Sequence, residues 1–97
     1  MRPRKCRRIG CLVNSNYFKP RGIPLVELEE TVLRPDELEA VRLADLNGLY
    51  QEEAAGQMRI SRQTFGRIID SAHKKIADAL LGGKALKIEI PLKGDAP

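Results

Sequence analysis

The chain has 97 residues, 42% of them hydrophobic and 31% charged, and a formal net charge of +4 at pH 7. This length suits one domain, and a domain this small buries a limited share of its surface, so a partner subunit would add to its stability. No apolar run approaches the roughly 20 residues that span a bilayer, and the N-terminus lacks the apolar segment of a secretory signal. We therefore expect a cytoplasmic protein without membrane contact, in which Cys6 and Cys11 stay reduced.

The charges fall into three blocks along the chain. Residues 1–22 carry seven Lys or Arg and no acid, residues 23–56 carry nine acidic and two basic residues, and residues 57–97 carry eight basic and four acidic residues. Two basic blocks on either side of an acidic one are typical of a protein that binds a polyanion. We divide the chain into a basic N-terminal arm with a turn region at 1–22 and a folded domain at 23–97.

The N-terminal third predicts little regular structure. Residues 1–8 have no hydrophobic periodicity, which is typical of a flexible basic arm. Pro20, Gly22 and Pro24 predict turns. Residues 25–33 alternate imperfectly between apolar and polar, which fits either a short strand or an extended connection.

Three helices are predicted in the middle of the chain. Pro35 followed by two acids indicates a helix that runs from about 36 to 46 and stops at Asn47-Gly48, although Arg34 is a poor N-cap. We expect this helix to be sandwiched between neighbours, because its apolar residues cover most of its circumference: Leu38, Ala40, Val41, Leu43, Ala44 and Leu46. A second helix covers roughly 51–58. The third runs from 62 to 81, begins after Ser61 and ends at Gly82-Gly83, and its apolar residues recur at spacings of three and four. This spacing predicts one buried seam made of Phe65, Ile68, Ile69, Ala72, Ile76, Ala79 and Leu80.

A strand is predicted after the two glycines, where Leu86, Ile88 and Ile90 alternate with polar residues. A lone strand has unpaired backbone groups and needs a partner. The candidates are residues 25–33, the region of Tyr17 and Phe18, or the same strand of another subunit.

Residues 51–70 carry the pattern that indicates a function. Ala54 and Ala55 are small enough for two helices to cross closely, a turn falls at Arg59-Ile60, and Ser61 is a good N-cap for the next helix. These features predict a helix-turn-helix inside a mainly α fold, with short extended segments at both ends.

The outward face of the third helix carries side chains of the types that contact DNA bases. With Phe65 pointing inward, the opposite side carries Gln63, Gly66, Arg67, Asp70 and Lys74, with Arg62 at the margin. Arg pairs bidentately with guanine and Gln with adenine in the major groove, and the helix N-terminus receives a phosphate. We expect base readout by Arg62, Gln63 and Arg67. Backbone contacts are expected from Ser61, Thr64, Lys74, Lys75, Arg2, Arg4, Lys5, Arg7 and Arg8.

Residues 37–81 resemble region four of bacterial sigma factors. More closely, the whole chain resembles a family of bacterial and archaeal proteins that are uncharacterised and expected to bind DNA. The similarity covers roughly residues 2–90 and includes RPRKCRRI, YFKP, GIPL and GKALKIE. It implies a sigma-like or winged-helix-like DNA-binding fold and names no DNA target. Two positions depart from the usual helix-turn-helix. Arg59 stands where the turn usually carries Gly, so we expect a non-glycine residue to adopt positive φ there, and Tyr50 stands where the second helix usually opens with Ser or Thr.

Other readings of these residues remain open. The helical pair could serve as a protein-interaction module for the transcription machinery, because sigma region-four folds also contact RNA polymerase. The acidic block at residues 23–56 would then form the binding surface. The basic arm either contacts phosphate and the minor groove or only solubilises the chain. RNA is disfavoured as a target because aromatic stacking residues are scarce.

Neither an enzyme nor a metal protein is expected. Cys6 and Cys11 with the distant His73 give at most three ligands, whereas structural zinc takes four. Paired acids such as Glu52-Glu53 begin helices, where acids are favoured without any catalytic role. No cofactor is expected. Because one helix reads only a few base pairs, we expect a homodimer on double-stranded DNA.

Overall fold

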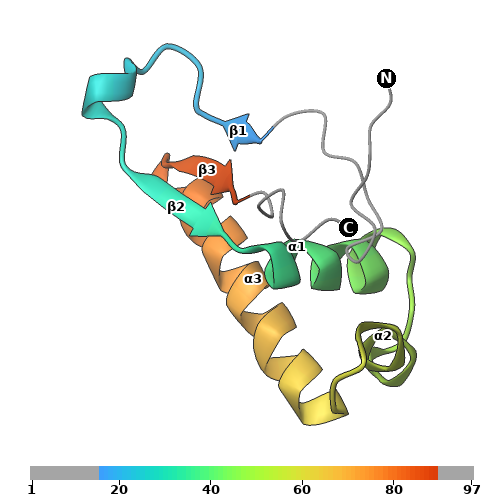
Figure 1. Cartoon of the computed structure of the whole chain (residues 1–97). Coiled ribbons are helices and arrows are strands. Elements are labelled where there is room, and N and C mark those ends of the chain that lie inside the picture. Colours follow the sequence, from blue (N-terminus) through green and yellow to red (C-terminus); the bar gives the residue numbers. More distant parts are fainter. Residues whose placement is uncertain (1–15, 90–97) are drawn as a thin grey trace, which may run out of the picture.

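The computed structural model describes residues 16–89. These residues form three α-helices and a small sheet, in the following order: β1 (Tyr17–Phe18), the 3-10 turn η1 (Leu25–Glu27), β2 (Glu30–Leu33), α1 (Pro35–Val41), the π-helical turn η2 (Arg42–Leu46), α2 (Gln51–Met58), α3 (Arg62–Gly82) and β3 (Ala85–Ile88). In Figure 1, α3 extends from the sheet at one end of the molecule to α2 at the other, and α1 lies against its middle. The expected mainly helical fold with extended segments at both ends is confirmed at this level.

The sheet joins the two ends of the described chain. Its strand order is β1-β3-β2, with β3 antiparallel to β1 and parallel to β2. Tyr17 is opposite Lys87, and Leu33 is opposite Ile88. Two of the three partners expected for the C-terminal strand, the Tyr17-Phe18 region and residues 25–33, therefore pair with it, one on each edge. Both edges of β3 are occupied within the chain, so this strand does not need the third candidate, the same strand of another subunit, as a partner.

The first helix shows how a poor N-cap is tolerated. The side chain of Arg34 makes no capping hydrogen bond, and instead the Arg34 N–H donates to Glu37 Oε1 at 2.8 Å. The helix continues past α1 into η2, where the Asn47 N–H donates to the Arg42 carbonyl at 2.9 Å, and Gly48 then turns with φ +75°. The predicted extent of 36–46 is confirmed, with a wider last turn than an α-helix has.

The core lies along one side of α3. Near its start, Phe65 is fully buried and packs with Ile69 against residues of α1, η2 and α2. Further along, Ala72 packs against Leu33 and Ile88 of the sheet. The predicted seam is confirmed for its buried members, but Leu80 is 77% exposed and does not belong to it. No helix among residues 16–89 is long and apolar enough to cross a bilayer.

Candidate nucleic-acid interface

A tight connection joins α2 to α3. Ala54 and Ala55 are 0% and 3% exposed and let the two helices approach closely around Phe65. Arg59 ends α2 in the left-handed conformation, with φ +62° and ψ +44°, and its N–H donates to the Gly56 carbonyl at 3.2 Å. The expectation that a non-glycine residue adopts positive φ here is confirmed. For an L residue this conformation costs on the order of 1 kcal/mol, so the turn is strained at Arg59.

The first turn of α3 is held by Ser61. Its hydroxyl oxygen accepts from the Thr64 N–H at 3.1 Å, and its O–H donates to Thr64 Oγ1 at 2.9 Å, which confirms the predicted N-cap. The two hydroxyls that were expected at phosphate are thus bonded to each other. The other N–H groups of the first turn have no intrahelical acceptor and point outward from the helix end.

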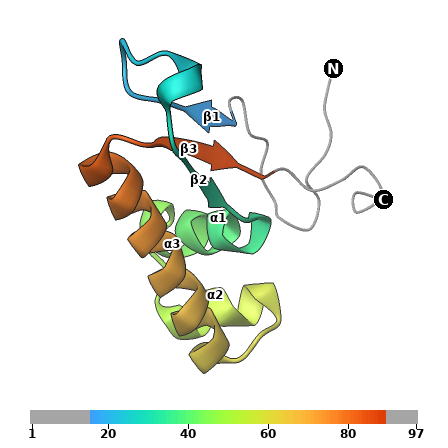
Figure 2. The ribbon, with the colours of Figure 1, turned by 90° about the vertical axis from the view of Figure 1, so that its left-hand side faces the viewer.

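The outer face of α3 is open. Figure 2 looks onto this side, where α3 crosses the front of the molecule with no described element over it. At 100° per residue, positions 63, 67, 70 and 74 share one stripe, which we call the outer stripe. Arg62 and the stripe residues Gln63, Arg67, Asp70 and Lys74 are all exposed. Among residues 16–89 none of these five side chains has a hydrogen-bond or ion-pair partner.

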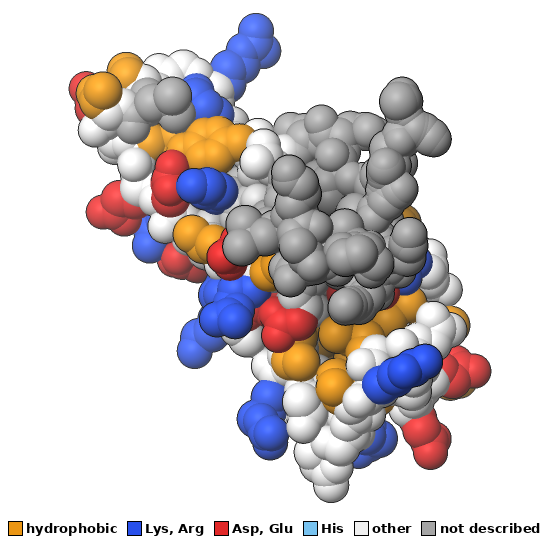
Figure 3. Space-filling model, in the orientation of Figure 1, with side chains coloured by type: hydrophobic (Ala, Val, Ile, Leu, Met, Phe, Trp, Pro, Cys, Tyr) orange, Lys and Arg blue, Asp and Glu red, His pale blue; other side chains and the backbone are white. Residues whose placement is uncertain are grey.

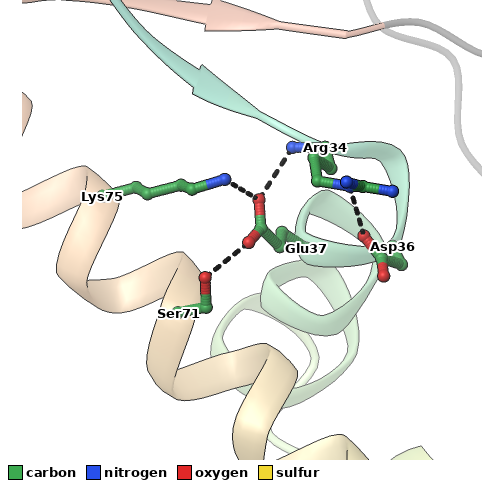
Figure 4. A network of polar contacts seen from close by, with 5 residues as sticks. All are labelled: Arg34, Asp36, Glu37, Ser71 and Lys75. Atoms are coloured by element: carbon green, nitrogen blue, oxygen red, sulfur yellow. Dashed lines mark hydrogen bonds and ion pairs between the residues drawn. The ribbon is translucent and has the colours of Figure 1, made fainter.

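Polar side chains on the flank of α3 that faces α1 are paired. Lys75 Nζ lies 2.8 Å from Glu37 Oε1, and the Ser71 hydroxyl donates to Glu37 Oε2 at 2.6 Å (Figure 4). Burial alone would raise the pKa of Glu37, but the bonds from the Arg34 N–H, Lys75 and Ser71 outweigh it and lower this pKa. Lys75 was grouped with the phosphate contacts, and the structure places it in this network instead. We leave it out of the interface.

Gly66 lies elsewhere than the pattern suggested. It is half-buried and faces α2, since a Cβ added there would lie 3.5 Å from Gln51 Oε1. It therefore does not belong to the outer face. His73 lies two turns after Gly66 on the same side of α3, where its Nε2 is 2.7 Å from Asp45 Oδ2 of η2.

Side chains of both charges lie on this face of the molecule. In the lower half of Figure 3, Lys and Arg side chains project on the left, along α3, and Asp and Glu side chains project at the right-hand edge, where a Lys or Arg side chain lies beside them. Among the described residues, no three His, Cys, Asp or Glu side chains are grouped so that they could hold a metal ion. The cysteines and the predicted arm contacts lie outside the described residues: Cys6, Cys11, Arg2, Arg4, Lys5, Arg7 and Arg8.

Sequence reasoning missed an apolar surface at the junction of η2 and α2. Leu46 is 79% exposed and Tyr50 is 81% exposed. The α1–η2 segment was expected to be sandwiched between neighbours, and Leu46 is the residue that contradicts this. The sequence held a signal for this surface at Tyr50, because an aromatic side chain at an N-cap position has no capping role. In the structure the Tyr50 N–H donates to Glu53 Oε1 at 3.3 Å.

Comparison with known proteins identifies relatives of the whole chain. Residues 1–94 match the model of a family described as "Protein of unknown function DUF134". Proteins named UPF0251 protein from Prosthecochloris aestuarii and Dehalococcoides mccartyi are each 60% identical over 88 residues, which is 91% of this chain. The match covers 57% of the first relative and 75% of the second, so the chain spans little more than half of the longer one. No solved structure matches the chain.

Proposed function

The chain belongs to the DUF134 family. From the geometry of α3 we propose that it is a cytoplasmic transcriptional regulator that reads double-stranded DNA with the outer face of this helix. In this proposal α2, residues 59–61 and α3 act as a helix-turn-helix of the sigma region-four type. The observation that carries the proposal is the set of exposed polar side chains at the start of α3 that have no partner among residues 16–89. Elsewhere on α3 the charged side chains are engaged in contacts with other elements.

The spacing of these side chains fits the major groove. Arg62 and Arg67 lie five residues apart, which is about 7.5 Å along a helix axis. The groove is about 12 Å wide and admits an α-helix, so Gln63 and Arg67, one turn apart on the outer stripe, face the base edges together. Arg62, at the margin of the stripe, reaches the bases from the side of the first turn. Lys74 lies two further turns along the same stripe, where the helix leaves the groove and meets the phosphate backbone.

The charge of the outer face is suited to a polyanion. From 62 to 74 it carries three cations and one acid, and within the described part of the chain its cations have no partner to leave before they bind phosphate. The basic arm would add backbone or minor-groove contacts through Arg2, Arg4, Lys5, Arg7 and Arg8. Such contacts raise affinity for any sequence and weaken steeply with salt, whereas base contacts discriminate between sequences.

Fluorescence anisotropy tests the proposal. Binding to a pool of random duplexes and to duplexes enriched from it is measured across a salt series for the wild type and for the Arg62→Ala, Gln63→Ala, Arg67→Ala triple variant. A matched control variant carries alanine at Arg21, Gln57 and Lys87. These residues are also exposed, and their replacement removes the same two positive charges. We expect selective binding to be lost in the first variant and kept in the control. If the two variants bind alike, α3 does not read DNA.

A homodimer remains part of the proposal, because two copies related by a dyad are needed for a useful site length. The sheet and most of the α3 seam are used within the chain, so the surface left for a second copy includes Leu80 and Leu81, which are 77% and 88% exposed. Light scattering at working concentration should give twice the chain mass. A monomeric mass would refute this part.

The second candidate function is docking to the transcription machinery, with RNA polymerase as the expected partner. The exposed Leu46 and Tyr50, next to Glu52 and Glu53 of α2, favour it, because an apolar patch rimmed by acids suits a basic protein surface. In that case Leu46→Ser with Tyr50→Ser would abolish the activity in cells, while the triple alanine variant of α3 would leave it intact.

A further inference from the structure

Asp70 is an acid in the middle of a surface that is otherwise basic. It lies on the outer stripe, three residues after Arg67 and four before Lys74, and its carboxylate has no partner among residues 16–89. The other acid of α3, Asp78, is bonded to Lys84 at 3.1 Å and to Thr31 at 3.1 Å. Asp70 is therefore not explained by the packing of the described fold.

A carboxylate in the major groove makes a strict chemical demand. It only accepts hydrogen bonds, so it is repelled by phosphate and by the acceptor groups of guanine and of thymine. The donors that the groove offers are the amino groups of cytosine and adenine, and Asp or Glu characteristically accepts from cytosine N4. An unpartnered acid on this stripe thus lowers affinity for most sequences and is compensated only where such a donor is present.

We infer that Asp70 is a specificity-determining residue that accepts a hydrogen bond from the amino group of a cytosine in the DNA site. Three residues of helix separate it from Arg67, which is about 4.5 Å along the axis, close to one base-pair step of about 3.4 Å. The site therefore holds a guanine contacted by Arg67 and a cytosine contacted by Asp70 at an adjacent or next-adjacent pair. The inference rests on the proposed function of the same face.

Selection from a randomised duplex library, read by sequencing, tests the inference. The wild type is compared with Asp70→Asn and Asp70→Ala, and Glu27→Gln is the control because it removes one charge from an exposed acid of η1, outside both proposed interfaces. We expect Asp70→Asn to change one position of the selected site from cytosine to adenine, since Asn pairs bidentately with adenine. Asp70→Ala should relax that position alone, with about a tenfold or larger loss of discrimination there, and Glu27→Gln should keep the wild-type site.

The outcomes separate this inference from the proposed function. If the Asp70 variants select the wild-type site and merely bind all duplexes more tightly, as the loss of a repulsive charge would cause, Asp70 is not a base reader and the inference is wrong. A wild-type protein that selects no site refutes the proposed function itself. Thermal unfolding of each variant confirms that the exposed substitutions leave the fold intact.

Discussion

Two neighbouring lysines of α3 allow a paired charge to be compared with one that is unpaired within residues 16–89. Lys75 is bonded to the buried carboxylate of Glu37 at 2.8 Å, whereas Lys74 is exposed on the outer stripe without a partner among the described residues. Replacing each by Met keeps most of the unbranched apolar stem of the side chain and removes one charge. We expect Lys75→Met to destabilise the fold and Lys74→Met to leave stability almost unchanged.

The size of the effect follows from the contacts. The side chain of Glu37 is 6% exposed, and the variant leaves it with the Arg34 N–H and the Ser71 hydroxyl as donors. A hydrogen bond to a charged group contributes about 1.5 to 3 kcal/mol. Because the Lys75 side chain is 30% exposed, solvent screens the pair, and we expect a loss of about 1 to 2 kcal/mol. In a domain of this size that lowers Tm by roughly 5 to 10 °C.

The pH dependence gives a second readout. The pKa of Glu37 is lowered in the folded protein, so its contribution to stability is full well above the ordinary value of about 4.3 and is lost as pH falls through the folded pKa. The difference between wild type and Lys75→Met should therefore be largest near pH 7 and should shrink as the solution is acidified. Urea unfolding followed by circular dichroism at several pH values measures it. A difference that stays constant with pH, or equal stability of the two Met variants, would refute the reasoning.

Three other substitutions test particular contacts. Arg59→Gly should raise the free energy of unfolding by about 0.5 to 1 kcal/mol, because glycine adopts φ +62° without strain, and a lower midpoint in urea would contradict this. Phe65→Ala removes a fully buried ring and should cost about 3 to 5 kcal/mol, enough to leave much of the protein unfolded by circular dichroism at 37 °C; a loss under 1 kcal/mol would mean that the core is not centred there. Tyr17 donates to Glu30 Oε2 at 2.7 Å, which raises the pKa of the Tyr17 hydroxyl, so Glu30→Ala should lower the pH at which Tyr17 ionises in the alkaline absorbance titration, and an unchanged curve would exclude that bond.

Local patterns predicted the helices well. The bounds of α2, the N-cap at Ser61, the positive φ at Arg59 and the terminator at Gly82-Gly83 all depend on residues next to each other in the chain. These features are decided by capping and backbone sterics, which act over a few residues. The C-terminal strand was also found from its alternation, although the sequence could not choose among its partners.

Features that depend on distant residues were not predicted. Which side of α3 faces α1 decides that Lys75 is bonded to Glu37 while Lys74 is open, and helical spacing alone leaves both near the surface. In the same way Gly66 was placed on the outer face, because the position of Gln51 beside it follows from how α2 packs. Leu46 and Leu80 were counted as core residues, since a periodic pattern does not show where the covering elements end.

The central claim, that the outer face of α3 binds duplex DNA, is tested most directly by a titration of the ¹⁵N-labelled protein with an enriched duplex, followed by amide chemical shifts. We expect the largest changes between residues 61 and 74, with smaller ones in the rest of the helices. Changes confined to residues 46–53, or no changes at a duplex concentration that saturates anisotropy, would contradict the account and move the interface away from α3.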